Sequence, residues 1–274
     1  AFLKRVDLDD RGVAWSRYLA ETREATAEVT AKFTEGAEPG HRETVTLTDY
    51  DPLGEEKVVA AAMYASSDLP DDRLQSLAHT MSPDERDAVL SAYVGERGNR
   101  RHKPGRAFER TGYRFDVLCD YGAFRDLQRH RLLTLEWQRL SPEHGFDTPD
   151  VIADAGMTEE WNRVMEDSAT TWAALSEHAG EDVAQYSVAM AYRIRFVMQM
   201  SAREAMHLIE LRSSPQGHPT YRRVAQQMYD LIEKNAGHRA IARTMTYLDT
   251  SDVDLERLEA ERRTEAKRKA ARAG

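Results

Sequence analysis

Two arginine-bearing segments carry the residue types from which the chemistry of this chain can be inferred. The first, RHRLLTLEWQRLS, begins at Arg129, and the second, SAREAMHLIELRSSPQGHP, begins about seventy residues later at Ser201. A guanidinium group on an otherwise apolar surface is tolerated where a carboxylate or a phosphate meets its fixed fork of donors. Together the two segments predict an anion-binding pocket for a nucleotide-like ligand.

The second segment is predicted to end a long helix over residues 181–211. Its polar side chains recur at helical spacing and would share one face: Arg195, Gln199, Arg203, His207 and Glu210. Such a stripe either faces water, with Arg203 paired to Glu210 or His207, or lines an internal site. Arg212 favours the internal site, because it precedes the breakers of SSPQGHP and a cation at that end can point into a pocket.

The first segment is predicted to lie on another helix, from Asp120 to about Leu140, which places the triplet Arg129-His130-Arg131 on a helical surface. A lone histidine is more often a satisfied core or surface residue than a ligand. We therefore interpret His130 as structural.

A basic loop, GERGNRRHKPGRA, precedes both segments at residues 95–107. It contains four glycine or proline breakers, and its basic side chains are Arg97, Arg100, Arg101, His102, Lys103 and Arg106. One interpretation is a solvated loop with scattered counterions, as is usual for a charge run. The other is a loop that closes over a phosphate, which gains support from the acidic balance of the rest of the chain.

Composition limits the class of protein. The 274 residues are 41% hydrophobic and 31% charged, which is typical of a globular chain. The net charge of -9 argues against a general nucleic-acid binder. No stretch approaches the roughly 20 apolar residues that span a bilayer, and no secretory signal is recognisable, so we expect no membrane association. The single cysteine, Cys119, favours a reducing compartment, and we expect a cytoplasmic protein.

The pattern of periodicity and breakers predicts three parts: an N-terminal helix and linker over 1–54, a main domain over 55–245, and a charged helical arm over 246–274. Ser82, Pro83 and Glu85 have the arrangement of a capped helix start. The expected elements are helices over 13–34, 58–65, 82–94, 158–178 and 219–234, a strand or ordered loop over 44–47, a strand over 113–119, a short helix opening at 237–238 and a charged helix over 252–272. The chain begins at Ala1 without methionine, which is compatible with processing or with a piece of a longer polypeptide.

Four blocks in the chain resemble the flavin-dependent thymidylate synthases, whose signature is RHR, seven residues, then Ser. The blocks are AAAMYASSDLP at 60–70, GRAFER at 105–110, RHR at 129–131 and SAREAMHLIELR at 201–212, and the likeness covers residues 55–245. The resemblance implies an α/β (α+β) fold with long central helices and a small, mainly antiparallel sheet. It also implies a homotetramer with FAD at subunit interfaces. The implied reaction is reductive methylation of dUMP to dTMP, with NADPH and methylenetetrahydrofolate as co-substrates.

The resemblance also implies roles for individual residues. The implied flavin-binding residues are Arg129, Arg131, Glu109, Arg203, His102 and His207. Arg212 matches an arginine that grips the uracil base and would carry the catalytic role, because positive charge placed at the pyrimidine helps C6 accept a hydride. Arg195 matches an arginine that holds the substrate phosphate.

Several positions depart from the family pattern near the nucleotide. Arg139 stands where the signature serine is expected, and Ser141 follows two residues later. Asp126 replaces a glutamine near the nucleotide phosphate, which brings two like charges together, while Arg139 could offset Asp126 by pairing with it. Ser201 replaces the first residue of Asn-Ala-Arg. Pro104 replaces a flavin-contacting histidine, whose place His102 would take if the alignment were gapped.

These departures leave alternatives open. The chain could be a degenerate, non-catalytic family member that acts as a structural or partner-binding half, or a flavoenzyme that acts on another nucleotide. The sequence has no Rossmann or P-loop motif. It also has no HExxH motif or Cys/His cluster, so we predict no metal.

Overall fold

The computed structural model describes residues 10–38, 43–251, 262, 265–266 and 269, and the chain divides into two compact units, Ala1–His41 and Arg42–Gly274. The first unit contains α1 (Asp10–Thr34), which confirms the helix predicted over 13–34. The predicted charged helix over 252–272 lies almost entirely outside the described residues.

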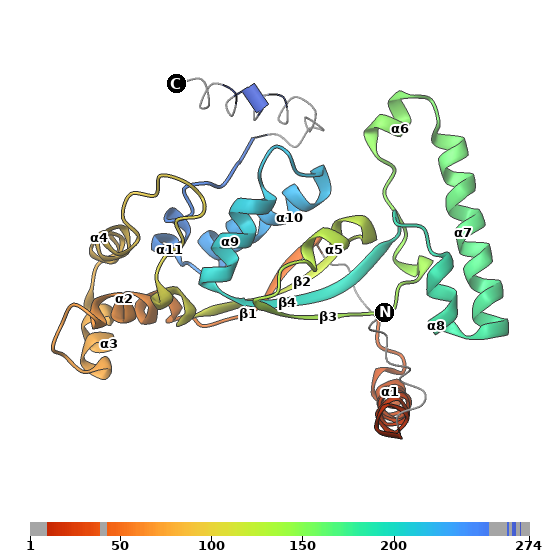
Figure 1. Ribbon diagram of the computed structural model, residues 1–274, viewed down its shortest axis with the longest axis horizontal. Helices are drawn as coiled ribbons and strands as arrows, with labels where there is room; N and C mark the ends of the chain where they lie inside the picture. Colours follow the sequence, from red (N-terminus) through yellow and green to blue (C-terminus); the bar gives the residue numbers. More distant parts are fainter. Residues whose placement is uncertain (1–9, 39–42, 252–261, 263–264, 267–268, 270–274) are drawn as a thin grey trace. The chain divides into compact units, whose positions relative to one another are not determined.

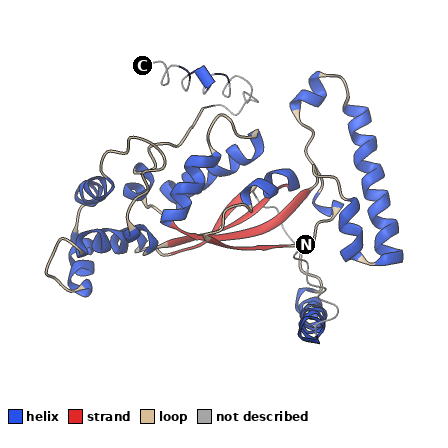
Figure 2. Ribbon diagram, viewed as in Figure 1, coloured by secondary structure: helices blue, strands red, loops and turns tan. Residues whose placement is uncertain are grey.

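The second unit is built on a four-stranded antiparallel sheet with the order β1-β2-β4-β3 (Figure 1). Its strands are β1 (Val45–Tyr50), β2 (Gly112–Asp120), β3 (Leu133–Trp137) and β4 (Arg193–Ser201). The two central strands pair along their full length, from Gly112 opposite Ser201 to Asp120 opposite Arg193. A small antiparallel sheet among helices confirms the predicted fold class (Figure 2).

The helices of this unit precede, interrupt and follow the strands. They are α2 (Gly54–Tyr64), α3 (Asp71–Thr80), α4 (Pro83–Val94), α5 (Tyr121–Leu127), α6 (Asp150–Asp154), α7 (Thr158–Ala179), α8 (Glu181–Ala184), α9 (Ala202–Arg212), α10 (Pro219–Asp230) and α11 (Arg239–Arg243). The predicted cap of α4 is confirmed, because Ser82 and Glu85 form a reciprocal capping box. Within the described residues, no helix is long and apolar enough to cross a membrane.

The core lies on one face of the sheet, against α5, α9 and α10. Alternate side chains of the two central strands are buried there: Tyr113, Phe115, Val117 and Cys119 on β2, and Ile194, Phe196, Met198 and Met200 on β4. The ring of Phe196 packs edge to face against that of Phe124 on α5, with centroids 4.8 Å apart. Burying each large side chain contributes about 1.5–3 kcal/mol, so the period of two along β2 and β4 fixes which face is inside.

Two helix predictions are wrong. The helix expected over 120–140 ends at Leu127, and Arg129, His130 and Arg131 lie in the turn that leads to β3. The helix expected over 181–211 is divided into α8, β4 and α9, so Arg195 and Arg203 do not share a helical face. Pairing of β4 with both β2 and β3 overrides the helical spacing of its arginines.

Candidate functional site

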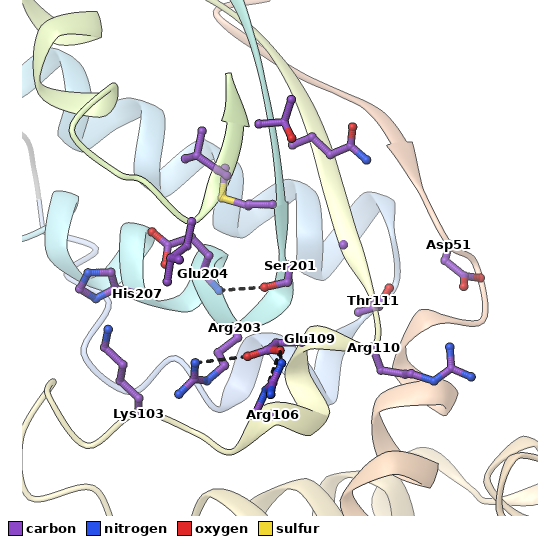
Figure 3. Close-up of a pocket in the computed structure, with 16 residues that line it drawn as sticks. Asp51, Lys103, Arg106, Glu109, Arg110, Thr111, Ser201, Arg203, Glu204 and His207 are labelled. Atoms are coloured by element: carbon purple, nitrogen blue, oxygen red, sulfur yellow. Dashed lines mark hydrogen bonds and ion pairs between the residues drawn. The ribbon is translucent and has the colours of Figure 1, made fainter. Parts of the chain in front are cut away.

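A pocket of about 980 Å³ lies where the N-terminus of α9 meets the ends of β2 and β4 (Figure 3). Its lining residues are Asp51, Lys103, Arg106, Glu109, Arg110, Thr111, Gly112, Leu132, Leu133, Thr134, Gln199, Met200, Ser201, Arg203, Glu204 and His207. This volume is at the upper end of the range for ligand sites, about 300–1,000 Å³. Four of the lining side chains are cationic, three are acidic and three are large and apolar, so the pocket can contact both charged and apolar parts of a ligand.

The local sequence explains why α9 begins at this pocket. Ser201 is its N-cap, and the Ser201 hydroxyl accepts a hydrogen bond from the Glu204 backbone N–H at 3.4 Å. The helix N-terminus therefore faces the pocket, where its partial positive charge favours an anion. Ser201 performs this capping in the place where the family pattern has Asn.

Arg203 and Glu109 meet in this pocket, as the resemblance implied for two flavin-binding residues. Arg203 Nη1 lies 3.3 Å from Glu109 Oε1, and Arg203 Nε donates to the Pro104 carbonyl at 2.9 Å. Arg106 donates to Glu109 through Nε and Nη2. The hydrogen bond from Arg106 is the main reason why the pKa of Glu109 lies below its usual value. Glu109 is therefore an ionised acceptor between two guanidinium groups.

His207, one turn further along α9, lies on the same wall beside Lys103 (Figure 3). Burial lowers the pKa of His207, and the charge of Lys103 lowers it further. The imidazole is therefore neutral at neutral pH and can donate or accept one hydrogen bond to a ligand.

His130 has a defined structural partner at each ring nitrogen. It is buried, its Nδ1 lies 2.9 Å from Glu204 Oε1, and its Nε2 accepts a hydrogen bond from Arg212 Nε at 3.1 Å. The tautomer with its proton on Nδ1 satisfies both contacts. The structural interpretation of His130 is thus refined: it joins the pocket wall to Arg212.

Arg212 ends α9 and is held on its other side by Asp126. Its Nη1 lies 3.5 Å from Asp126 Oδ1, and its Nη2 donates to the Asp126 carbonyl. The Tyr221 ring lies 5.4 Å from the guanidinium carbon. Asp126 therefore pairs with Arg212, and not with Arg139 as the sequence had suggested as one possibility.

The other residues implied by the resemblance lie outside this pocket lining. Arg129 and Arg131 are exposed in the turn after α5, and Arg129 Nη1 is 3.8 Å from Asp126. His102 turns into its own loop, where its Nδ1 accepts from the Gly98 N–H at 3.2 Å. The side chain that reaches the pocket from that loop is its neighbour Lys103.

Three of the predicted substrate-binding residues, Arg195, Arg139 and Ser141, have partners within the chain. Arg195 Nη1 on β4 lies 3.6 Å from Asp116 on β2. Arg139 pairs with Glu181 and Asp182, and Ser141 caps a short 3-10 turn over Pro142–His144.

A metal-binding arrangement that the sequence did not reveal also borders the pocket. Ligand atoms of His130, Glu204 and His207 lie within 4.8 Å of one another. A metal on His130 would require a free lone pair on Nδ1 while Nε2 carried a proton, which would then face the Arg212 N–H. The donor set therefore fits hydrogen bonding better than metal coordination.

Comparison with known protein families identifies the family of this chain. The family described as thymidylate synthase complementing protein matches residues 46–236. The chain belongs to this family. The match confirms the resemblance inferred from the RHR and SAREAMHLIELR segments.

Similar proteins include two described only as UPF0159 proteins. The chain is 38% identical over 231 residues to UPF0159 protein Ta1429 of Thermoplasma acidophilum, covering 83% of this chain and 46% of that protein. It is 34% identical over 245 residues to a UPF0159 protein of Chlamydia muridarum, covering 89% of this chain and 46% of that protein. The chain thus spans less than half the length of these curated relatives.

Two solved structures share the fold. One is a UMP/dUMP methylase, PolB, from Streptomyces cacaoi bound with 5-Br dUMP, with a TM-score of 0.57, 19% identity and coverage of 73% of this chain and 94% of that one. The other is thymidylate synthase X from Helicobacter pylori with FAD and dUMP, with a TM-score of 0.54, 16% identity and coverage of 74% and 100%.

Sequence reasoning missed part of the pocket. Thr111 and Met200 line it although no motif included them, and Arg110 lines it although no role was predicted for it. Arg110 ends the GRAFER block and Met200 directly precedes Ser201, so both are adjacent to segments that the sequence did identify.

Proposed function

We propose that this chain is an FAD-binding, thymidylate-synthase-like domain that takes part in the reductive methylation of dUMP to dTMP, with NADPH and methylenetetrahydrofolate as co-substrates. The observation that carries the proposal is the pocket in which Arg203, Glu109 and His207 converge, in a chain that belongs to the family. Two proteins that share the fold are described as bound to dUMP or its 5-bromo analogue, and one of them as bound to FAD.

The residues present fit a flavin. Leu132, Leu133 and Met200 offer an apolar wall for a ring system, while Arg203 and Lys103 offer charge to phosphates. A bound reduced flavin would supply the hydride that the reaction needs. Glu109 would keep Arg203 oriented, and neutral His207 would give a ligand one directional hydrogen bond.

Arg212 is the proposed catalytic residue, and its neighbours determine how it would act. His130 holds Nε, so the remaining N–H groups of Arg212 would be the ones to polarise a pyrimidine. In this structure those groups face Asp126. A nucleotide would have to compete with the Asp126 carboxylate for them.

We further propose that the chain forms a homotetramer with FAD between subunits. In that arrangement a shared site would receive residues from more than one chain: Arg129, Arg131, His102, Arg195, Arg139 and Ser141. These residues lie outside the pocket lining within one chain. A cytoplasmic location fits the single buried Cys119.

A second candidate function is a degenerate family member that serves as a structural or partner-binding half. The pairing of Arg212 with Asp126, and of Arg139 with two acidic residues, favours it, because both cations are already neutralised within the chain.

Turnover separates the two candidates. Purified protein is incubated with FAD, NADPH, methylenetetrahydrofolate and dUMP labelled with tritium at C5, and tritium release and dTMP are measured. The enzyme proposal predicts release that depends on all four components and is abolished by Arg212→Ala. Bound FAD without release would refute the catalytic proposal and favour the non-catalytic half.

A further inference from the structure

Arg97 differs from the other cations of the basic loop because its side chain is buried. Its Nη1 and Nη2 contact the two carboxylate oxygens of Glu210 at 2.5 and 2.6 Å, and the two side chains are 3% and 0% exposed. Removing one member of such a pair would leave an uncompensated buried charge. The geometry is that of a bidentate pair, for which lysine would be a poor substitute.

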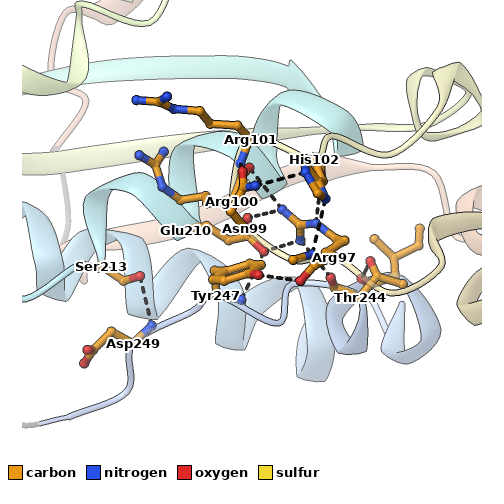
Figure 4. Close-up of polar contacts among 12 residues, drawn as sticks. Arg97, Asn99, Arg100, Arg101, His102, Glu210, Ser213, Thr244, Tyr247 and Asp249 are labelled. Atoms are coloured by element: carbon orange, nitrogen blue, oxygen red, sulfur yellow. Dashed lines mark hydrogen bonds and ion pairs between the residues drawn. The ribbon is translucent and has the colours of Figure 1, made fainter. Parts of the chain in front are cut away.

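Every N–H donor of Arg97 has a partner. Besides Glu210, Nε donates to the His102 carbonyl at 2.7 Å, Nη2 to the Arg100 carbonyl at 3.3 Å, and Nη1 to the Thr244 carbonyl at 3.2 Å (Figure 4). A guanidinium group has five N–H donors, and these contacts use all of them. Arg97 is therefore an internal anchor and has no donor left for a ligand.

Tyr247 adds a second attachment for the same loop. Its hydroxyl donates to the Arg97 carbonyl at 2.5 Å, its backbone N–H donates to Glu210 Oε1 at 3.2 Å, and its ring lies 5.1 Å from the Arg97 guanidinium carbon. Three separate segments are thus joined: the loop, α9 and the chain after α11.

The far end of the loop is fixed to the pocket. The Pro104 carbonyl accepts a hydrogen bond from Arg203 Nε at 2.9 Å. Between the two attachments, Lys103 lines the pocket beside His207, and its charge contributes to the lowered pKa of that histidine. The loop is therefore held at both ends, and Lys103 lies between the two attachments at the pocket wall.

We infer that Arg97 and Glu210, with Tyr247, are positioning residues that hold Lys103 as a contact for the phosphate groups of the ligand in the pocket. This inference rests on the proposed flavin site for the identity of that ligand, and it deepens that proposal. The sequence left open whether this loop is solvated or closes over a phosphate, whereas the structure assigns Arg97 as its anchor and Lys103 as the pocket contact.

The test compares ligands with and without phosphate. Dissociation constants of FAD and riboflavin are measured by flavin fluorescence for the wild type, Tyr247→Phe, Arg97→Lys and Lys103→Ala. Tyr247→Phe removes one hydroxyl and leaves the buried ion pair intact, so it should fold. Tyr186→Phe, at a tyrosine that is 93% exposed, is the matched control. Urea unfolding of each variant confirms that it is folded.

We expect each of the three variants to weaken FAD binding by about tenfold, the loss of roughly one charge-assisted contact, while riboflavin binding and the control stay unchanged. An unchanged ratio of FAD to riboflavin affinity in the folded variants would overturn the inference. Equal weakening of both ligands would also overturn it, because a purely structural role would have that effect.

If the wild type binds neither flavin, the proposed function fails, and inorganic pyrophosphate then tests the inference separately. Thermal stabilisation of the wild type by pyrophosphate that is reduced in Tyr247→Phe and Lys103→Ala would support a positioned phosphate site. Absence of stabilisation, or equal stabilisation of all variants, would contradict it.

Discussion

The contact between Asp126 and Arg212 gives the sharpest prediction about substrate binding. At 3.5 Å and an effective dielectric constant near 20, the attraction of the two charges is about 5 kcal/mol before desolvation. Because the Asp126 side chain is 35% exposed and the Arg212 side chain 13% exposed, screening and desolvation leave about 1–2 kcal/mol. A nucleotide that binds Arg212 must replace this attraction of about 1–2 kcal/mol between Asp126 and Arg212. Asp126→Asn should therefore tighten dUMP binding by roughly 5- to 30-fold.

The assay is calorimetric titration of dUMP into Asp126→Asn and the wild type, each in the presence of FAD. The control is Asp87→Asn, which removes the same charge from a carboxylate that faces Arg243 on α11, with Oδ2 at 3.4 Å from Nη1. Added salt should reduce the difference between Asp126→Asn and the wild type, because screening weakens the attraction between Asp126 and Arg212. An equal or weaker affinity in Asp126→Asn would refute the idea that Asp126 competes for Arg212.

Four further predictions concern the fold and its titratable groups. Phe196→Ala should lower the free energy of unfolding by about 3–5 kcal/mol and Gln199→Ala by less than about 0.5, measured in urea; similar losses would contradict the strand assignment. Ser82→Ala should cost about 1 kcal/mol in the same assay, and no loss would argue against the capping box. Burial lowers the pKa of His238, so as pH falls the unfolded state takes up the proton first, and the free energy of unfolding should decrease below about pH 6.5. His238→Gln should reduce this dependence of the free energy of unfolding on pH. An unchanged dependence would argue against His238 as its source. Burial raises the pKa of the Cys119 thiol, so a thiol reagent should label it only in urea, and rapid labelling of folded protein would contradict this.

Local signals in the sequence were sufficient for several elements. The capped start of α4, the alternation of β2 and the amphipathic α7 could all be read from neighbouring residues. Each depends on short-range contacts, so it needs no knowledge of the rest of the chain.

The strands β3 and β4 could not be recognised in the same way. Arg195, Gln199 and Arg203 are spaced as on a helix, and the methionines and alanines around them are good helix formers. Ile194, Phe196 and Met198 nevertheless alternate with period two, and this signal determines the structure because β4 pairs on both edges. The helical periodicity gave the wrong prediction for β4 because pairing with strands distant in the sequence determines its structure.

The candidate site likewise contains some residues that the sequence identified and others that it did not. Arg203, Glu109 and His207 were identified and converge, whereas Lys103 was recognised only as one of several basic residues in a loop. The roles of Arg97 and His130 depend on partners 113 and 74 residues away along the chain, Glu210 and Glu204. No pattern in the sequence indicates such pairs.

The most direct test of FAD binding is the absorbance spectrum of the purified protein before and after addition of FAD, with the released cofactor identified by chromatography. We expect a bound-flavin spectrum that dUMP perturbs, and weaker FAD binding in Arg203→Gln, since Arg203 lines the pocket. If no flavin binds under any condition, the proposed FAD site is wrong and the pocket arginines have a structural role alone.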